Sequence, residues 1–165
     1  MTKTRLLLVD DHAIVRLGLM TLLNDQPDME VVAEASSAAE AVRAVEKYRP
    51  DVVLMDIRLP GEGGIEATRQ ITARFPESKV VMLTSFADDD LVMRAINAGA
   101  MGYVLKQVGN EELLRAIQAA ARGEALCRAV GPSKDHHRIM KVSRPRHRAI
   151  KPRQRIFLAR ESRAM

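Results

Sequence analysis

The chain has 165 residues, of which 47% are hydrophobic and 3% aromatic, so it can form one domain with an aliphatic core and an extension. Its single cysteine, Cys127, excludes an internal disulfide framework and fits a reducing compartment. The sequence shows neither a signal-peptide apolar region of about 7–15 residues nor the roughly 20 apolar residues of a membrane helix, which favours a cytoplasmic protein.

The net charge of +5 hides two segments of opposite sign. Residues 1–126 hold 14 Lys and Arg against 19 Asp and Glu, a net charge of −5. Residues 127–165 hold 12 against 2, a net charge of +10. We therefore predict an acidic domain over residues 1–125 and a basic tail over residues 126–165.

Short apolar runs alternate with segments of helical periodicity through the acidic part. The runs are rich in Val, Leu and Met and mostly lack polar alternation, which is typical of buried parallel strands. Strands are predicted at 5–9, 30–35, 51–56, 79–84 and 101–105. Helices are predicted at 12–25, 37–48, 64–75, 88–98 and 110–122. Five such units predict an α/β doubly wound fold, with right-handed crossovers and a parallel sheet covered on both faces.

Local signals support several helix boundaries. Gly99 is expected to end the fourth helix in the left-handed conformation, and Asn110 to be the N-cap of the fifth. The first helix is expected to have one apolar face. That face consists of Ile14, Val15, Leu17, Leu19 and Leu22.

Polar side chains stand at the carboxyl end of four predicted strands. Asp10 and Asp11 follow the first strand, Asp56 ends the third, Thr84 ends the fourth and Lys106 follows the fifth. Ligands of such sheets bind at the carboxyl ends of the strands, so these side chains are expected to share one pocket. Three carboxylates, a hydroxyl and an ammonium group there could bind a divalent metal and accept a phosphoryl group.

Asp56 is the candidate phosphoacceptor, because a carboxylate can attack phosphorus to give an acyl phosphate. Asp11 and Asp56 can supply hard oxygen ligands to Mg²⁺, with Asp10 acting through a coordinated water and the backbone carbonyl of Arg58 completing the site.

Lys106 and Thr84 are the candidate groups for the phosphoryl oxygens. Lys106 can pair first with the acceptor carboxylate and then with a phosphoryl oxygen, while Thr84 donates its hydroxyl to another.

Each of these residues also has a purely structural explanation. Asp10 and Asp11 could cap the first helix, Lys106 could be a solvated strand end and Thr84 part of a turn. Their joint placement favours the site. His12 is interpreted as a surface helix residue and not as a metal ligand.

The motifs resemble the receiver domain of bacterial two-component response regulators, over about residues 1–125. The resemblance is carried by Asp10-Asp11, Val53-Leu54-Met55-Asp56, Pro60-Gly61 with Gly63-Gly64, Leu83-Thr84-Ser85 and Gly102-Tyr103-Val104-Leu105-Lys106. Four further segments resemble the LuxR-type DNA-binding branch. They are Asp11-His12, Ser85-Phe86-Ala87, Ala98-Gly99-Ala100 and Gly123-Glu124-Ala125.

The resemblance implies a flavodoxin-like sheet of order 2-1-3-4-5 and phosphoryl transfer from a sensor histidine kinase to Asp56, with Mg²⁺ as cofactor. Thr84 is then expected to move toward the phosphate and the Tyr103 ring to turn inward, which changes the partner preference of the face formed by the fourth helix, fifth strand and fifth helix. A homodimer is expected through that face or through the first and fifth helices. No enzyme activity is expected beyond Mg²⁺-dependent self-phosphorylation and dephosphorylation.

The sequence departs from the family in two places. Gln107 stands where many receivers have proline, and residues 127–165 match no helix-turn-helix output domain. The tail is predicted to be disordered because charged residues outnumber large apolar ones. A shifted reading frame, a truncated gene and a genuine extension all remain open.

Three functions are compatible with the sequence of the whole chain. The first is a response regulator that ancestrally controls transcription, with DNA binding uncertain and at most non-specific contact through the basic tail. The second is a stand-alone receiver that acts as a phosphorelay intermediate or phosphate sink. The third is an aspartyl-phosphate phosphatase, which usually needs a second acid where this chain has Arg58.

Overall fold

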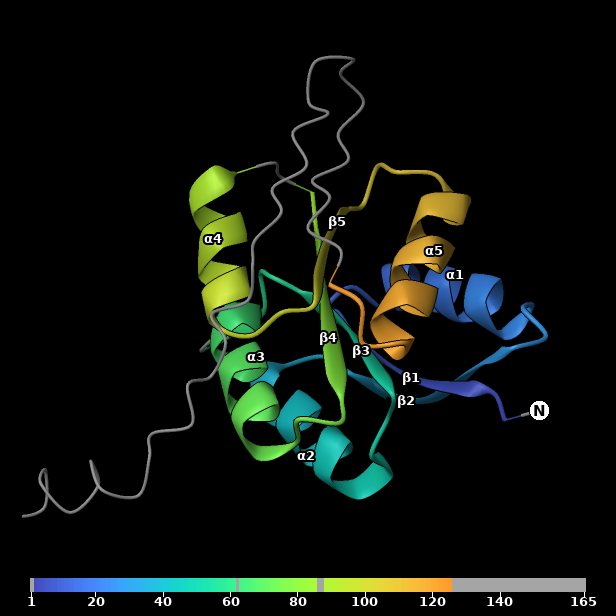
Figure 1. Cartoon of the computed structure of the whole chain (residues 1–165), viewed down its shortest axis with the longest axis horizontal. Helices are drawn as coiled ribbons and strands as arrows, with labels where there is room; N and C mark the ends of the chain where they lie inside the picture. Colours follow the sequence, from blue (N-terminus) through green and yellow to red (C-terminus); the bar gives the residue numbers. More distant parts are fainter. Residues whose placement is uncertain (1, 62, 86–87, 126–165) are drawn as a thin grey trace, which may run out of the picture.

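The computed structural model describes residues 2–61, 63–85 and 88–125, which alternate between five strands and five helices (Figure 1). Within these residues no helix combines the length and the apolar character that a membrane crossing requires. The predictions for the basic tail fall on residues 126–165 and lie outside the described part of the chain.

The five strands form one parallel sheet of order β2-β1-β3-β4-β5. The strands are β1 (Thr4–Val9), β2 (Met29–Ala35), β3 (Val52–Asp56), β4 (Lys79–Thr84) and β5 (Gly102–Leu105). The helices are α1 (Ala13–Asn24), α2 (Ala38–Tyr48), α3 (Gly63–Arg74), α4 (Asp89–Asn97) and α5 (Asn110–Ala121). The doubly wound fold and its strand order are confirmed, and the predicted boundaries lie within one residue of the observed ones.

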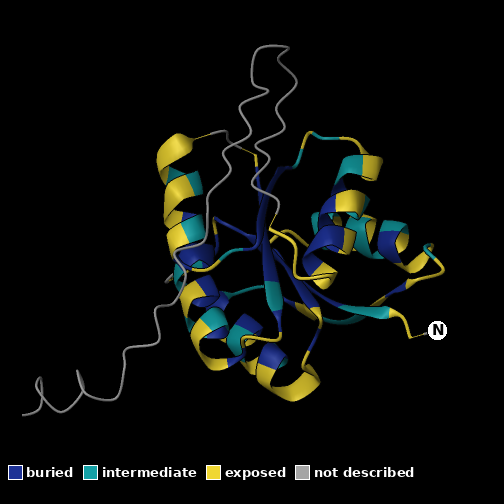
Figure 2. Cartoon of the chain, viewed as in Figure 1, coloured by how far each residue is buried: buried dark blue, intermediate teal, exposed yellow. Residues whose placement is uncertain are grey.

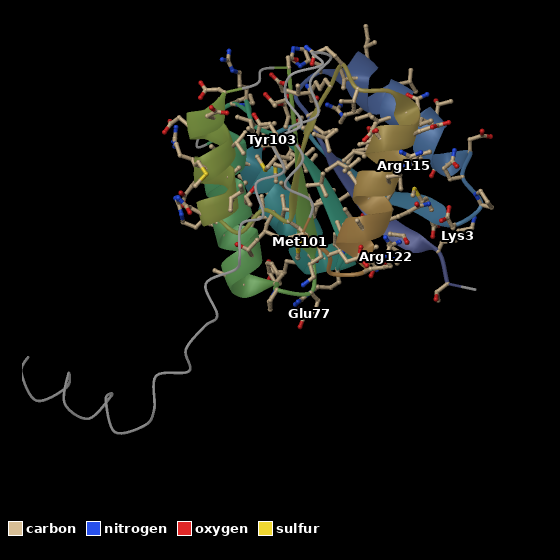
Figure 3. All side chains as sticks on the ribbon, turned by 45° about the horizontal axis from the view of Figure 1, so that its top comes forward. Lys3, Glu77, Met101, Tyr103, Arg115 and Arg122 are labelled. Atoms are coloured by element: carbon tan, nitrogen blue, oxygen red, sulfur yellow. The ribbon has the colours of Figure 1, made fainter. Side chains whose placement is uncertain are left out.

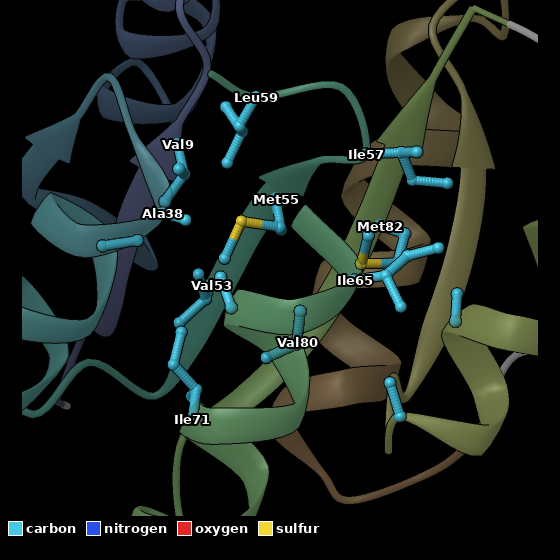
Figure 4. Packing of buried hydrophobic residues seen from close by; sticks show 14 of the residues in the cluster. Val9, Ala38, Val53, Met55, Ile57, Leu59, Ile65, Ile71, Val80 and Met82 are labelled. Carbon is cyan, nitrogen blue, oxygen red and sulfur yellow. The ribbon is translucent and has the colours of Figure 1, made fainter. Parts of the chain in front are cut away.

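The helices cover the sheet in two layers, with α1 and α5 on one face and α2, α3 and α4 on the other (Figures 1 and 2). Successive strand residues point to opposite faces, so each strand serves two cores. In β3, Val53 and Met55 pack under α2 and α3 (Figure 4), whereas Val52 and Leu54 pack under α1 and α5. This two-sided burial is why the strands read as continuous apolar runs.

The first helix does not bury its whole predicted apolar face. Val15, Leu19 and Leu22 are half-buried, and the last two pack against the core beneath α1. Ile14, in contrast, is 86% exposed and Leu17 63% exposed. At about 100° per residue, Leu17 lies far round the helix from Val15 and Leu19, because it is two residues from each. The expectation that all five residues form one apolar face is therefore wrong, because Ile14 and Leu17 lie outside the half-buried stripe of α1.

Two predicted helix ends have different outcomes. Gly99 adopts a φ of +103°, which confirms the left-handed cap, and an added Cβ there would lie 2.6 Å from Thr72 Oγ1. Asn110 is not an N-cap: Gly109 occupies that position with extended backbone, and Asn110 is the first helical residue. The Asn110 side chain therefore stands one position too late to cap the helix.

Candidate functional site

The strand order brings the four carboxyl-terminal polar positions to one edge of the sheet. Asp56 is the last residue of β3 and Thr84 the last of β4, while Asp10 directly follows β1 and Lys106 directly follows β5. In the register, Val9 pairs with Met55 and Asp56 with Leu83, so these strand ends are level.

Lys106 joins the two buried carboxylates of the site. Its Nζ lies 2.8 Å from Asp10 Oδ2 and 3.2 Å from Asp56 Oδ2. The carboxylate side chains are 4% and 7% exposed, and the lysine side chain is 21% exposed. The sequence interpretation paired Lys106 with the acceptor Asp56 alone, whereas in the structure the shorter contact is with Asp10.

The electrostatics of the three groups differ. Burial alone would raise the pKa of Asp10, but hydrogen bonds from Lys106 and His12 outweigh it and lower that pKa. Burial raises the pKa of Asp56, and the opposing effects of Lys106 and the Arg58 backbone N–H do not cancel it. Burial alone would lower the pKa of Lys106, but contacts with Asp10 and Asp56 raise it. Each shift reflects how well a buried charge is compensated by its neighbours.

Asp11 and His12 complete one side of the site. The His12 backbone N–H donates to Asp10 Oδ1 at 2.8 Å, and His12 Nδ1 lies 3.1 Å from Asp10 Oδ1 and 3.0 Å from Asp11 Oδ1. His12 is also the N-cap residue of α1, with no side-chain cap hydrogen bond. Neither Asp10 nor Asp11 is that cap residue, so capping of α1 does not explain them.

The donor set suits a divalent cation. Potential ligand atoms of Asp10, Asp11, His12 and Asp56 all lie within 4.8 Å of one another. Three carboxylates face one ammonium group, and a divalent ion would balance the remaining negative charge with the oxygen ligands that Mg²⁺ prefers. The Arg58 backbone N–H donates to Asp56 Oδ1 at 3.2 Å, which places the Arg58 peptide beside this carboxylate.

Gly64 is a residue of the site that sequence reasoning noted only as part of a motif. Its N–H donates to the Ile57 carbonyl at 2.9 Å, which ties the start of α3 to the end of β3. An added Cβ would lie 2.0 Å from the Asp56 carbonyl oxygen, so only glycine allows this approach. The adjacent pair Gly63-Gly64 after the acceptor strand was the signal that could have revealed the contact.

Thr84 and Tyr103 form a buried pair beside the carboxylates. Thr84 is 2% exposed and Tyr103 1% exposed, and their side chains share a hydrogen bond. The Tyr103 ring lies on the α4 side of the sheet (Figure 3), in the core that includes Ala95 and Ala98. Burial raises the pKa of the Tyr103 phenol, against the opposing effect of the Thr84 hydrogen bond.

Comparisons with known proteins agree with this geometry. Residues 6–118 match the response regulator receiver domain family. The chain is 49% identical over 120 residues to the transcriptional regulatory protein LiaR of Bacillus subtilis, covering 73% of this chain and 57% of that protein. It is 46% identical over 121 residues to the oxygen regulatory protein NreC of Staphylococcus aureus, covering 73% and 56%.

A crystal structure of a LuxR-family two-component response regulator from Aurantimonas superposes with a TM-score of 0.72 and 42% identity, covering 75% of this chain and 89% of that one. The chain therefore belongs to the response regulator receiver domain family, with relatives in the LuxR branch. The members of this family are signalling domains, and the family is not a class of enzymes. The chain spans little more than half the length of the curated relatives that it matches.

Proposed function

We propose that this chain is a two-component response regulator in which Asp56 accepts a phosphoryl group from a sensor histidine kinase. The observation that carries the proposal is the Lys106 ammonium group, 3.2 Å from Asp56 Oδ2 at the carboxyl edge of the sheet. An Asp56 carboxylate oxygen forms the new bond to phosphorus as the bond between phosphorus and the kinase histidine nitrogen breaks. Lys106 and Thr84 are then within the same site to pair with phosphoryl oxygens.

Asp10, Asp11, Asp56 and the backbone carbonyl of Arg58 are proposed to hold Mg²⁺. When bound, the ion supplies positive charge for the phosphoryl oxygens. Asp10 is proposed to act through a coordinated water, since one of its oxygens contacts Lys106 and the other accepts from the His12 N–H.

Thr84 and Tyr103 are proposed to connect the acceptor to a partner-binding face. Their hydrogen bond couples the end of β4 to the middle of β5. A Thr84 hydroxyl that turns toward a phosphoryl oxygen leaves the Tyr103 phenol, which changes the packing between β5 and α4.

Residues 1–125 are proposed to be the receiver and residues 126–165 a separate basic tail without a recognisable output domain. The matched family segment, residues 6–118, lies within the first of these ranges. Transcription control is proposed as the output of the lineage, because LiaR is named a transcriptional regulatory protein. We further propose that the protein works in the cytoplasm and that its own chemistry is limited to self-phosphorylation and dephosphorylation.

A homodimer is proposed through the α1–α5 face or the α4–β5–α5 face. Exposed apolar side chains favour the first, because Ile14 and Leu17 on α1 are 86% and 63% exposed while Met93 on α4 is 38% exposed. Size measurement before and after phosphorylation, with Leu17→Glu and Met93→Glu variants, distinguishes the two faces.

The proposed acceptor is tested by intact-mass spectrometry of the full chain with Mg²⁺ and acetyl phosphate. One phosphoryl group is expected on the wild type and on Asp28→Asn, whose side chain is exposed, and none on Asp56→Asn. An unmodified wild type that also stays unmodified with a histidine kinase donor would overturn the proposal. DNA binding by the full chain that weakens with salt would support an output through the tail, and its absence would favour a relay.

A further inference from the structure

His12 is placed where a metal ligand would stand, although its position at the start of a helix gave no such indication. Its Nδ1 lies 3.0 Å from Asp11 Oδ1 and 3.1 Å from Asp10 Oδ1. The His12 backbone N–H also donates a hydrogen bond to Asp10 Oδ1 at 2.8 Å. This bond fixes the position of the Asp10 carboxylate relative to the His12 backbone.

These separations match the edges of a coordination octahedron. Two ligand atoms at neighbouring corners, each about 2.1 Å from the ion, are about 3.0 Å apart. His12 Nδ1 and Asp11 Oδ1 already have that spacing, and Asp56 offers a further oxygen within the 4.8 Å cluster, while Asp10 stays the water-mediated ligand of the proposed function. Little rearrangement would therefore be needed for the ring nitrogen to bind an ion held by the carboxylates.

The ring can present a lone pair toward the carboxylates. The His12 side chain is 68% exposed, so Nε2 can carry the ring proton while solvent satisfies it. In the alternative tautomer Nδ1 carries the proton and hydrogen-bonds to Asp10 and Asp11, which gives the same distances without any metal role. The two arrangements differ in one observable, a bond between nitrogen and the ion.

We propose that His12 is a direct ligand of the divalent cation and makes this site favour Mn²⁺ and Co²⁺ over Mg²⁺. The inference rests on the metal site of the proposed function. Carboxylate and carbonyl oxygens alone suit Mg²⁺, whereas an imidazole nitrogen adds affinity for transition-metal ions and little for Mg²⁺. Replacement of His12 should therefore lower the affinity for Mn²⁺ and Co²⁺ more than it lowers the affinity for Mg²⁺.

The test uses the full chain loaded with Mn²⁺ and pulsed electron paramagnetic resonance, which detects nitrogen bound to the ion. The three other histidines are first replaced in one background variant, His136→Ala/His137→Ala/His147→Ala, so that only His12 remains. Nitrogen coupling is expected in this background and should vanish when His12→Asn is added. Calorimetry in the same pair should show Mn²⁺ and Co²⁺ affinity falling at least about tenfold, with Mg²⁺ affinity changing less than about threefold.

Two other outcomes overturn the inference and are distinguishable. In the first, Mn²⁺ binds without nitrogen coupling, binds the His12→Asn variant with equal affinity and does not bind Asp56→Asn. His12 would then not be a ligand, and the proposed metal site would stand without it. No Mn²⁺ or Mg²⁺ binding by the wild-type chain would remove both the inference and the metal part of the proposed function. A Tm of His12→Asn that is no lower than that of the wild type guards against loss of folding, since the side chain is exposed and asparagine is a favourable N-cap residue at the start of α1.

Discussion

Asp10 and Asp56 share the ammonium group of Lys106, yet the pKa of Asp10 is lowered and that of Asp56 is raised. Burial acts against ionisation of both carboxyls, but their compensation differs. The Asp10 carboxylate accepts hydrogen bonds from Lys106 Nζ and from the His12 backbone N–H, each at 2.8 Å. The Asp56 carboxylate accepts hydrogen bonds from Lys106 Nζ and from the Arg58 backbone N–H, each at the longer distance of 3.2 Å. Asp10 is thus the well-stabilised anion, and Asp56 is the carboxylate whose negative charge destabilises the fold.

Asp56→Asn is expected to raise the stability of the metal-free protein near neutral pH. A folded-state pKa above the unfolded value of 3.8 means that ionisation destabilises the fold as pH rises through that range. Removing the charge should therefore raise Tm by a few degrees at pH 7, since about 1 kcal/mol corresponds to about 4–8 °C for a small domain. Thermal unfolding in the presence of a chelator is the measurement.

The pH dependence supplies the control for this variant. Below about pH 3.8 the wild-type carboxyl is protonated in both states, so the Asp56→Asn advantage should disappear. Asp10→Asn should behave oppositely and lower Tm at pH 7, because the depressed pKa of Asp10 contributes stability that is lost as pH falls below 3.8. A less stable Asp56→Asn at pH 7 would contradict the assignment of Asp56 as the uncompensated charge.

Lys106→Met is expected to destabilise the fold at pH 7, because it leaves two buried carboxylates without their shared cation. The loss should be about 2 kcal/mol, below the roughly 3–5 kcal/mol of fully buried pairs, since the Lys106 side chain is 21% exposed. Denaturant unfolding measures it. Adding Asp56→Asn to Lys106→Met should recover part of the loss; no recovery would mean that the carboxylates do not repel each other.

The contribution of Lys106 also has a predictable alkaline limit. Its pKa is raised above 10.5 in the folded protein, so its stabilisation is complete below that pH and is lost as pH rises through the folded value. As pH rises above neutral, the difference in stability between wild type and Lys106→Met should therefore persist until strongly alkaline pH. A difference that shrinks near neutral pH would argue against the ammonium contacts.

The fold and the gathering of polar residues could be predicted because both follow from strand periodicity. Continuous apolar runs such as Val52–Met55 exist only where both faces of a sheet are covered, and parallel strands place the residues after each run at one edge. Pattern alone therefore placed Asp56 and Lys106 together, although the roles of these residues remain predictions.

Other contacts were beyond the sequence because they depend on how loops turn. Nothing in the periodicity directs the His12 ring toward Asp11, and the Gly64 approach to Asp56 depends on the path between β3 and α3. The exposure of Ile14 depends on which side of α1 packs against the sheet. Asn110 failed as a cap because boundaries shift by a residue when glycine can occupy the cap position.

Gly64→Ala is expected to destabilise the fold by about 3 kcal/mol, the upper end of the overpacking range, because its Cβ would meet the Asp56 carbonyl oxygen at 2.0 Å. Gly18→Ala is the matched control, since that glycine lies in α1 with nothing within 4 Å of an added Cβ. The control should gain about 0.5–1 kcal/mol from higher helix propensity. Similar urea midpoints for the two variants would show that α3 can move away from the acceptor strand.

Tyr103→Phe is expected to lower stability at pH 7 by about 1 kcal/mol, because it removes the hydrogen bond with Thr84 and keeps the buried ring. The titration of the wild type provides a second readout. Burial raises the pKa of Tyr103 above 10.0, so one of the two tyrosines in the chain should ionise late when absorbance is followed against pH. That late step should be missing in Tyr103→Phe.

Thr84 variants test the other partner of this hydrogen bond. Thr84→Ser keeps a hydroxyl and should preserve the late phenol titration, whereas Thr84→Val removes the hydroxyl at nearly constant volume. Since the hydrogen bond with Thr84 acts to lower the pKa of Tyr103, the valine variant should move the phenol titration to still higher pH. If the titration is identical in the serine and valine variants, Thr84 does not contact the phenol in solution, and β4 is not coupled to β5 through this pair.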